Sequence, residues 1–138
     1  MSLTTLQGLL GSRLYDFATE NGLSVAWEGV EFQPEQDAAY LRPVLLPSEP
    51  RAAAVGATAA DYIRGIYQID VLGPAGNGWG EVYGIADELR AYFNRGLSLT
   101  GDDSALTVEK SAPGPAIVED SRFKVIVEVI FHAYMEAV

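Results

Sequence analysis

Three closely spaced glycines follow an alternating apolar segment, which raises the question of a phosphate-binding loop. The stretch DVLGPAGNGWGEVYGIADELRAYF runs from an alternating apolar pattern through Gly76, Gly78 and Gly80 into a helical pattern. A dinucleotide-binding fingerprint needs G-x-G-x-x-G, and here the third glycine comes one position early. No lysine or arginine lies between Asp70 and Arg90 to neutralise a phosphate. We therefore predict a plain turn between a strand and a helix, with no cofactor.

The single histidine, His132, is the only side chain whose ordinary pKa suits proton transfer near neutral pH. Glu128 and Lys124 lie on the same face of its predicted strand. A catalytic triad also needs a nucleophile within hydrogen-bond reach, and no G-x-S-x-G signature marks one. We predict a surface or interface histidine and no catalytic residue.

Acidic pairs occur at Asp87-Glu88, Asp102-Asp103 and Glu119-Asp120. None has the alternating ligand spacing of a calcium loop, and the chain has no cysteine for a zinc–thiolate site. Two carboxylates could serve a glycosidase, but their separation cannot be read from sequence. We predict solvated turns and an exposed helix face, no metal site and no enzyme.

The overall composition excludes several classes of protein. The chain has 138 residues, about half of them apolar, and a net charge of −10. Such an acidic chain lacks the basic face with which proteins bind nucleic acid. No apolar run approaches the roughly 20 residues that span a bilayer, and the N-terminus lacks a signal-peptide pattern. We expect one soluble, cytoplasmic domain over residues 1–138.

Two segments show helical periodicity. The first ends at Asn21-Gly22, and the second ends before Gly96. Gly8 and Gly11 interrupt the first and suggest close backbone packing, with another subunit as one partner. The apolar stripes are Leu3, Leu6, Leu10, Leu14 and Phe17 in the first helix, and Val82, Ile85, Ala86, Leu89 and Phe93 in the second.

Alternating segments predict strands on both sides of the second helix. LSVAWEGVEFQP and AAYLRPVLLP precede YIRGIYQIDVLG, and Pro43 favours an edge position for the second of these. After the helix, LSLTGDDSALTVEKSAPGPAIVED predicts short strands joined by Gly-Asp and Pro-Gly turns. The order α-β-β-β-α-β-β-β predicts an α+β fold, with two helices on one face of a mostly antiparallel sheet.

The last predicted strand, RFKVIVEVIFHAYM, is apolar on one face and mixed on the other. Ile126, Ile130 and Tyr134 interleave with polar residues on the mixed face. A strand with apolar residues on both faces is normally covered on both. We expect another subunit or the protein's own long loop to cover this second face.

The long connection over residues 48–61 is rich in alanine. We interpret it as a loop or protruding hairpin, with a short helix as the alternative. Connections of this length are usually functional or disordered, and small side chains such as Val55 lose little entropy on ordering. The alternative to a contact segment is a mobile tip with no role. Arg51 is its one basic residue. Arg51 and Val55 therefore join Ile126, Ile130 and Tyr134 as candidate subunit or partner contacts.

Several segments together resemble phage tail proteins of the tail-terminator type. They are WEGVEFQP, YLRPVLLP and GIYQIDVLGPAGNGWGEVYGIADELRAYF, followed by a β-rich C-terminal end. The resemblance implies two helices on an antiparallel sheet. It also implies a ring-forming protein, often hexameric, that caps the tail tube and provides the surface for joining to the head.

On this resemblance we expect a non-enzymatic virion assembly protein in the tail, assembled in the host cytoplasm. Its partners would be further copies of itself, the tail-tube protein and a head-completion protein, with no sequence-specific nucleic acid and no membrane. The acidic composition fits a lumen through which DNA slides without binding. The alternative is a small soluble α+β module that binds a cellular protein.

Overall fold

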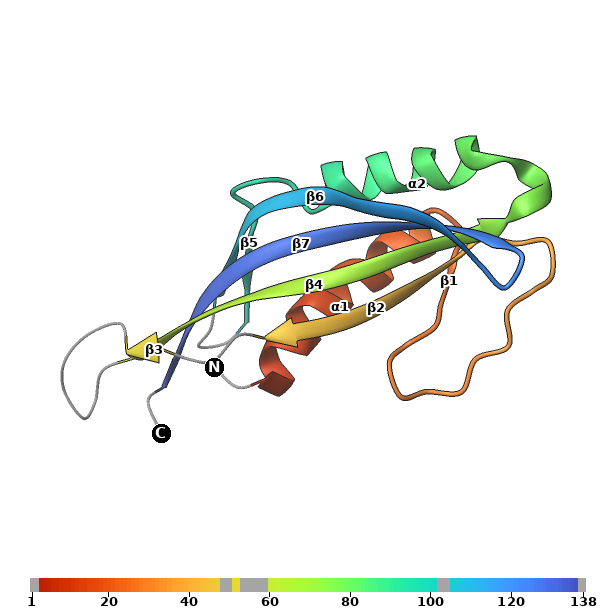
Figure 1. Ribbon diagram of the computed structural model, residues 1–138. Helices are drawn as coiled ribbons and strands as arrows, with labels where there is room; N and C mark the ends of the chain where they lie inside the picture. The colour runs from red at the N-terminus through yellow and green to blue at the C-terminus, as the bar shows by residue number, and fades with distance from the viewer. Residues whose placement is uncertain (1–2, 48–50, 53–59, 102–104, 137–138) are drawn as a thin grey trace.

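The computed structural model describes residues 3–47, 51–52, 60–101 and 105–136. One long curved sheet carries two helices on the same face (Figure 1). The elements in chain order are α1 (Leu3–Glu20), β1 (Ser24–Val25), β2 (Tyr40–Pro47), β3 (Arg51–Ala52), β4 (Ala60–Pro74), the 3₁₀ turn η1 (Ala75–Asn77), α2 (Trp79–Tyr92), β5 (Ser98–Thr100), β6 (Ala105–Glu119) and β7 (Arg122–Glu136).

The sheet order is β1-β2-β4-β7-β6-β5, and β3 pairs with β4 outside this path. Every pair is antiparallel except β1 with β2. The α+β prediction, the order of the longer elements and the placement of both helices on one face are confirmed. The structure adds the two-residue strand β3 and the turn η1 to the predicted order. The long strands β4 and β7 form the centre of the sheet, as Figure 1 shows.

The α1 stripe buries Leu6, Leu10 and Leu14 against the sheet, while Leu3 at the start stays half exposed. The helix ends as predicted, because Gly22 adopts a φ of +64° and lets Leu23 N–H donate to Ala18 O at 2.8 Å. At Gly11 an added Cβ would lie 3.6 Å from the Trp27 ring. Gly11 thus packs closely against Trp27 of the same chain. At Gly8, no described atom lies within 4 Å of an added Cβ.

The second helix packs on β4 and β7 through the predicted stripe, of which Ile85 is only partly buried. Gly73 makes this packing possible, because an added Cβ would lie 2.7 Å from Cγ1 of Val82. Gly78 has a φ of +75° and begins the helix without a side-chain cap. The glycine-rich segment is therefore the predicted turn. Gly73 allows the close approach of α2, and Gly78 allows the positive φ at the start of the helix.

One prediction about the C-terminal strands is wrong. The short strand β5 follows α2 as expected, but residues 105–119 form one 15-residue strand, β6, and Pro113-Gly114 is not a turn. Register shifts between Val108 and Lys110 and between Pro113 and Ala116 let the strand continue past a proline that cannot donate to the ladder. The tight turn lies at Asp120 and Ser121, with φ values of 48° and 62°.

The first predicted strand is also much shorter than expected. Only Ser24–Val25 pair with β2, and residues 26–39 wrap around the edge of the sheet. Beyond Leu41, no described strand pairs with the outer edge of β2, so Pro43 occupies the predicted edge position. Its missing N–H therefore costs no ladder hydrogen bond.

The predicted loop over residues 48–61 lies largely outside the described residues, and Val55 lies there too. Its described ends form a hairpin, in which Arg51 pairs with Tyr62 and Ala52 with Asp61. The hairpin interpretation is confirmed at this base, and β4 already begins at Ala60. In Figure 1 this hairpin lies at the end of the sheet farthest from the β6–β7 turn.

Candidate interaction surfaces

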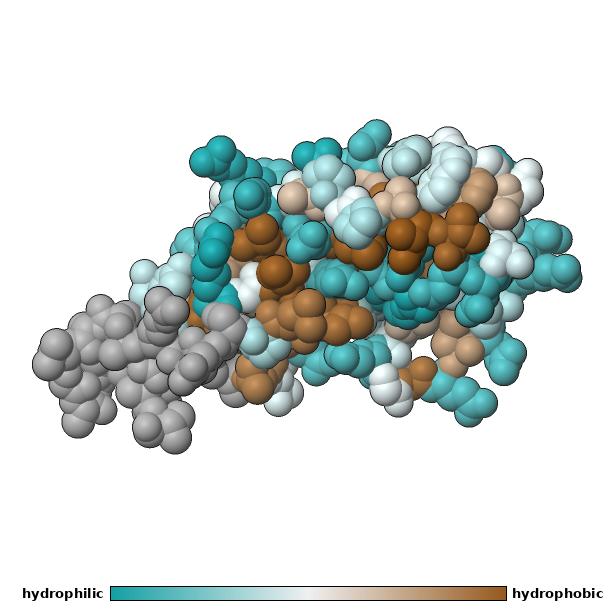
Figure 2. Space-filling model, viewed as in Figure 1, coloured by the Kyte–Doolittle hydropathy of each residue, from teal (hydrophilic) through white to brown (hydrophobic). Residues whose placement is uncertain are grey.

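The sheet face opposite the helices, called the open face here, carries a row of apolar side chains. Ile66 and Ile130 stand opposite each other on β4 and β7, and Leu46 on β2 stands opposite Ile66. We call Leu46, Ile66 and Ile130 the apolar row. Leu46 is 45% exposed, and the two isoleucines are partly exposed. Figure 2 looks onto this face and shows apolar side chains gathered over its centre.

The rest of the open face is mixed. Val44 and Ile126 extend the apolar area away from the row, beside Gln68 and Glu128. Residues 26–39 cover only one end of the face, where Phe32 packs on Tyr40 with ring centroids 4.9 Å apart. Within the described part of the chain, the apolar row is left accessible.

Three of the five predicted contact residues lie on this face. Ile126, Ile130 and Tyr134 all project from β7 as predicted, and Tyr134 is 55% exposed. Ile126 and Ile130 flank Glu128, whereas Tyr134 lies farther along and contacts Tyr62 edge-on, with ring centroids 5.6 Å apart. Arg51 is placed by its backbone in β3. That these residues contact a partner stays a prediction.

Leu46 and Ile66 belong to this surface but are not among the predicted contact residues. Ile66 could have been found, because the alternation that separates Gln68 and Asp70 from Tyr67 assigns Ile66 to the same face as Gln68. Leu46 could not, since only the register of β2 on β4 places it beside Ile66.

A cluster of charged side chains joins four strands at one end of the open face. Arg42 on β2 donates to Asp70 on β4 at 2.9 Å and to Glu119 on β6 at 2.8 Å. Lys124 on β7 donates to Glu119 at 3.0 Å, and Gln68 donates to Asp70 at 3.1 Å. Asp70 is 3% exposed, so its charge is compensated within the sheet.

The same contacts shift the pKa values of Glu119 and Arg42. Hydrogen bonds from Arg42 and then Lys124 lower the pKa of Glu119 to about 2. The bond to Glu119 raises the pKa of Arg42 above its already high ordinary value, against the opposing effect of desolvation. Arg42 and Glu119 are therefore both ionised at neutral pH, and their hydrogen bonds tie β6 to β2 across the sheet.

A second cluster surrounds His132 on the open face. Arg64 Nε lies 3.1 Å from Glu109 Oε2, and His132 Nδ1 lies 3.3 Å from the same oxygen. The hydrogen bond from Arg64 is the largest cause that lowers the pKa of Glu109. Tyr62 stacks on the His132 ring with centroids 5.7 Å apart. The histidine thus lies at the surface, in an ion-paired aromatic patch.

The structure does not bring the described members of the acidic pairs together into one site. Asp87 and Glu88 are exposed on α2, Glu119 belongs to the cluster with Arg42, and Asp102-Asp103 lies outside the described residues. Among the described residues, no group of three or more His, Asp or Glu side chains could hold a metal ion.

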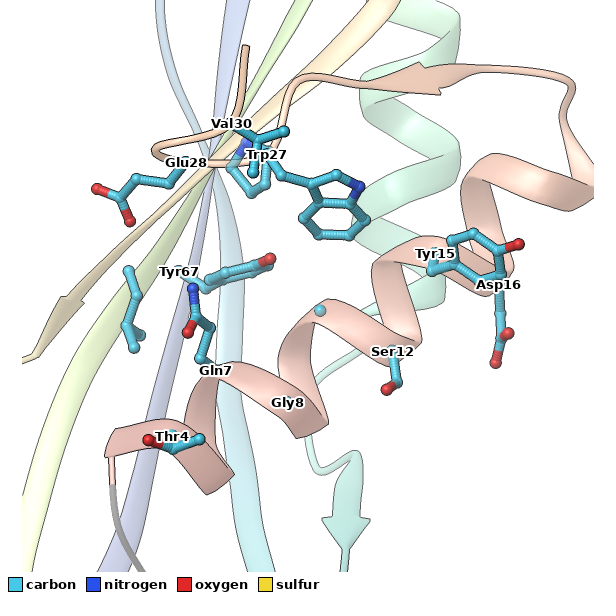
Figure 3. A pocket seen from close by; sticks show the side chains of 13 residues that line it. Thr4, Gln7, Gly8, Ser12, Tyr15, Asp16, Trp27, Glu28, Val30 and Tyr67 are labelled. Atoms are coloured by element: carbon cyan, nitrogen blue, oxygen red, sulfur yellow. The ribbon is translucent and has the colours of Figure 1, made fainter. Parts of the chain in front are cut away.

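A groove of about 600 Å³ runs between α1 and the free edge of β2. Figure 3 shows Trp27 and Tyr67 on its inner side, with Glu28 and Asp16 at its rim. Burial and the nearby Glu28 charge raise the pKa of Tyr67. Two acidic and no basic side chains line the groove, which is completed by Thr4, Gln7, Gly8, Gly11, Ser12, Tyr15, Val30, Pro43 and Leu45.

A shallower hollow of about 500 Å³ lies at the other edge of the sheet, near β5 and β6. Its walls carry Arg64, Arg95 and Lys110, with Glu109 as the one acidic residue. The turn beside it is fixed by Gly96 N–H donating to Val108 O at 2.8 Å. The two edges of the sheet thus differ in the sign of their charge.

These features define a sheet-based protein whose accessible surfaces suit contact with other proteins. The comparisons with known proteins agree. Residues 5–131 match the family model described as phage tail terminator protein, so the chain belongs to that family. The family is structural and non-enzymatic, and the chain therefore has a role in assembly of a phage tail, where it contacts other tail components.

One solved structure of a protein without a functional name supports the fold. It shares 27% identity with the chain, covers 96% of each chain and has a TM-score of 0.78. None of the curated proteins compared with the chain matches it significantly. Within the described residues, neither helix has the length and apolar character needed to cross a bilayer.

Proposed function

We propose that copies of this chain close into a ring that caps the end of the tail tube and joins it to the head. The observation that carries the proposal is the family match over residues 5–131, combined with an accessible apolar row in the middle of the sheet. A contiguous apolar area on a soluble protein usually marks a surface that another protein covers.

The apolar row, together with Ile126 and Tyr134, forms the surface against which the tail-tube protein packs. Leu46 and Tyr134 are about half exposed, so covering them removes substantial apolar area from water. The charged clusters around His132 and around Arg42 lie on either side of the row along the strands and would fix the orientation of the partner. The segment over residues 48–61, through Arg51 and Val55, adds a second contact.

The ring itself requires that each copy present one surface to the next and a different surface to the previous copy. A rotation that closes gives a ring, and six copies is the number that the resemblance implies. Assembly would take place in the host cytoplasm, with the head-completion protein on the side of the ring away from the tube.

The mass of the purified chain, measured by analytical ultracentrifugation with and without the tail-tube protein of the same phage, tests this proposal. We expect a ring-sized species, either alone or on tube ends. A chain that stays monomeric and never associates with tubes at any tested concentration would contradict the proposal.

A further inference from the structure

Opposite edges of the sheet carry surfaces of opposite charge. The sheet order places β2 near one edge and β6 with β5 at the other. Beside β2, the groove has Asp16 and Glu28 at its rim and no basic side chain. Beside β6, the hollow has three basic side chains and one acidic side chain. We call these the acidic edge and the basic edge.

The basic edge holds charges that the described chain does not compensate. Arg95 and Lys110 are exposed and form no ion pair with a described residue, whereas Arg64 is held by Glu109. The register shift between Val108 and Lys110 gives β6 an extra residue, Glu109, at this place. Such bulges re-aim side chains at the edges of sheets. In a chain with a net charge of −10, two cations without an ion-pair partner in one hollow suggest a surface that meets acidic groups of a partner.

The acidic edge is equally uncompensated. Asp16 and Glu28 are exposed and form no ion pair within the described part of the chain. Next to them, β2 from Arg42 onward has no described strand on its outer side. Apolar side chains of Trp27 and Leu45 line the groove between these acids, so a docked residue could bury its aliphatic stem there.

We propose that neighbouring copies in the ring meet edge to edge, with Arg95 and Lys110 of one copy seated at the groove rim formed by Asp16 and Glu28 of the next. This inference rests on the proposed function, because it names the contact that closes the ring. The partner is a second copy of this chain, and the argument for it is charge complementarity between the two edges. A two-fold contact that used one edge of each copy would bring like charges together. Complementary charges on opposite edges favour a head-to-tail contact over a two-fold one.

Paired charge reversals test the contact. The basic-edge variant is Arg95→Glu with Lys110→Glu, and the acidic-edge variant is Asp16→Lys with Glu28→Lys. All four side chains are exposed, so both variants should fold. A matched control reverses Asp87 and Glu88 to lysine on the exposed face of α2. Circular dichroism verifies the fold of each variant before its association is measured.

Association is measured by ultracentrifugation at low and high salt, alone and on tail-tube ends. We expect each edge variant alone to associate at least about tenfold more weakly than the wild type, because like charges then meet. An equimolar mixture of the two variants should regain association, since their edges are again complementary. Salt should weaken the wild-type contact, and the α2 control should associate normally.

The outcomes separate this inference from the proposed function. If the wild type forms rings and both edge variants do so equally well, the edge contact is wrong and the ring stands. If both variants fail but their mixture does not recover, charge pairing between these edges is also wrong. If the wild type neither self-associates nor binds tube ends, the proposed function and this inference fall together.

Discussion

Asp70 lies almost fully buried in the sheet, and its Oδ2 accepts a hydrogen bond from Arg42 Nη2 at 2.9 Å. The two residues stand opposite each other on β2 and β4. Arg42 in turn binds Glu119, which is 77 residues away in the sequence. The edge strand is thereby tied to the hairpin formed by β6 and β7.

We predict that Asp70→Ala lowers the free energy of unfolding by about 1–3 kcal/mol, because it leaves Arg42 and Gln68 without a buried acceptor. Urea unfolding followed by circular dichroism measures the change. Asp87→Ala, at an exposed position on α2, is the control and should change stability by less than about 0.5 kcal/mol. Equal effects of the two substitutions would show that the buried pair does not matter.

The pKa of Glu119 predicts a loss of stability in acid. Its folded value of about 2 lies below its ordinary value of 4.5. The contribution of its ion pairs is therefore fully present above pH 4.5 and is lost as the pH falls from 4.5 toward 2. In Glu119→Gln, stability between pH 5 and pH 3 should fall less steeply than in the wild type, as followed by thermal unfolding. If the stability of the wild type and of Glu119→Gln fell equally steeply over this pH range, the lowered pKa of Glu119 would be contradicted.

Gly73 tests the packing of α2 on β4. Gly73→Ala places a methyl group 2.7 Å from Cγ1 of Val82 and should cost about 1–3 kcal/mol through overpacking. Combining it with Val82→Ala should recover part of this loss, so that the double variant is more stable than the sum of the two single effects. Gly76→Ala, with no described atom within 4 Å of the new Cβ, is the matched control.

The sequence predicted most of this fold because the long central strands alternate strictly. In β7 the alternating residues from Val125 to Ala133 are buried on the helix-bearing face, as the pattern predicts, and both helices bury most of the stripes that their periodicity indicates. Such local patterns are set by burial on one face and need no knowledge of neighbours.

What the sequence could not predict depends on which strands become neighbours. Pro113-Gly114 is typical of a turn, yet pairing of β6 with β7 on both sides of it keeps the strand continuous. The apolar row and the cluster of Arg42 with Asp70 and Glu119 each combine residues from three strands. Their assembly follows from register, which one sequence does not reveal.

The open face gives the most direct test of the central claim, that this chain ends tube growth by covering the tube with its sheet. Ile66→Thr combined with Ile130→Thr removes apolar area from the apolar row and keeps β-branched side chains suited to a strand. Val118→Thr makes a similar change at a position that is 63% exposed, beside Phe123 on the helix-bearing side of the β6–β7 hairpin.

The decisive measurement is the length of tail tubes polymerised from purified tube protein, determined by electron microscopy with and without this chain. We predict that the wild type and Val118→Thr stop tube growth and are seen at tube ends. The Ile66→Thr/Ile130→Thr variant should fold normally but leave tubes as long as those grown without it. Wild-type protein that leaves tube length unchanged, or a doubly substituted variant that still caps tubes fully, would contradict the claim.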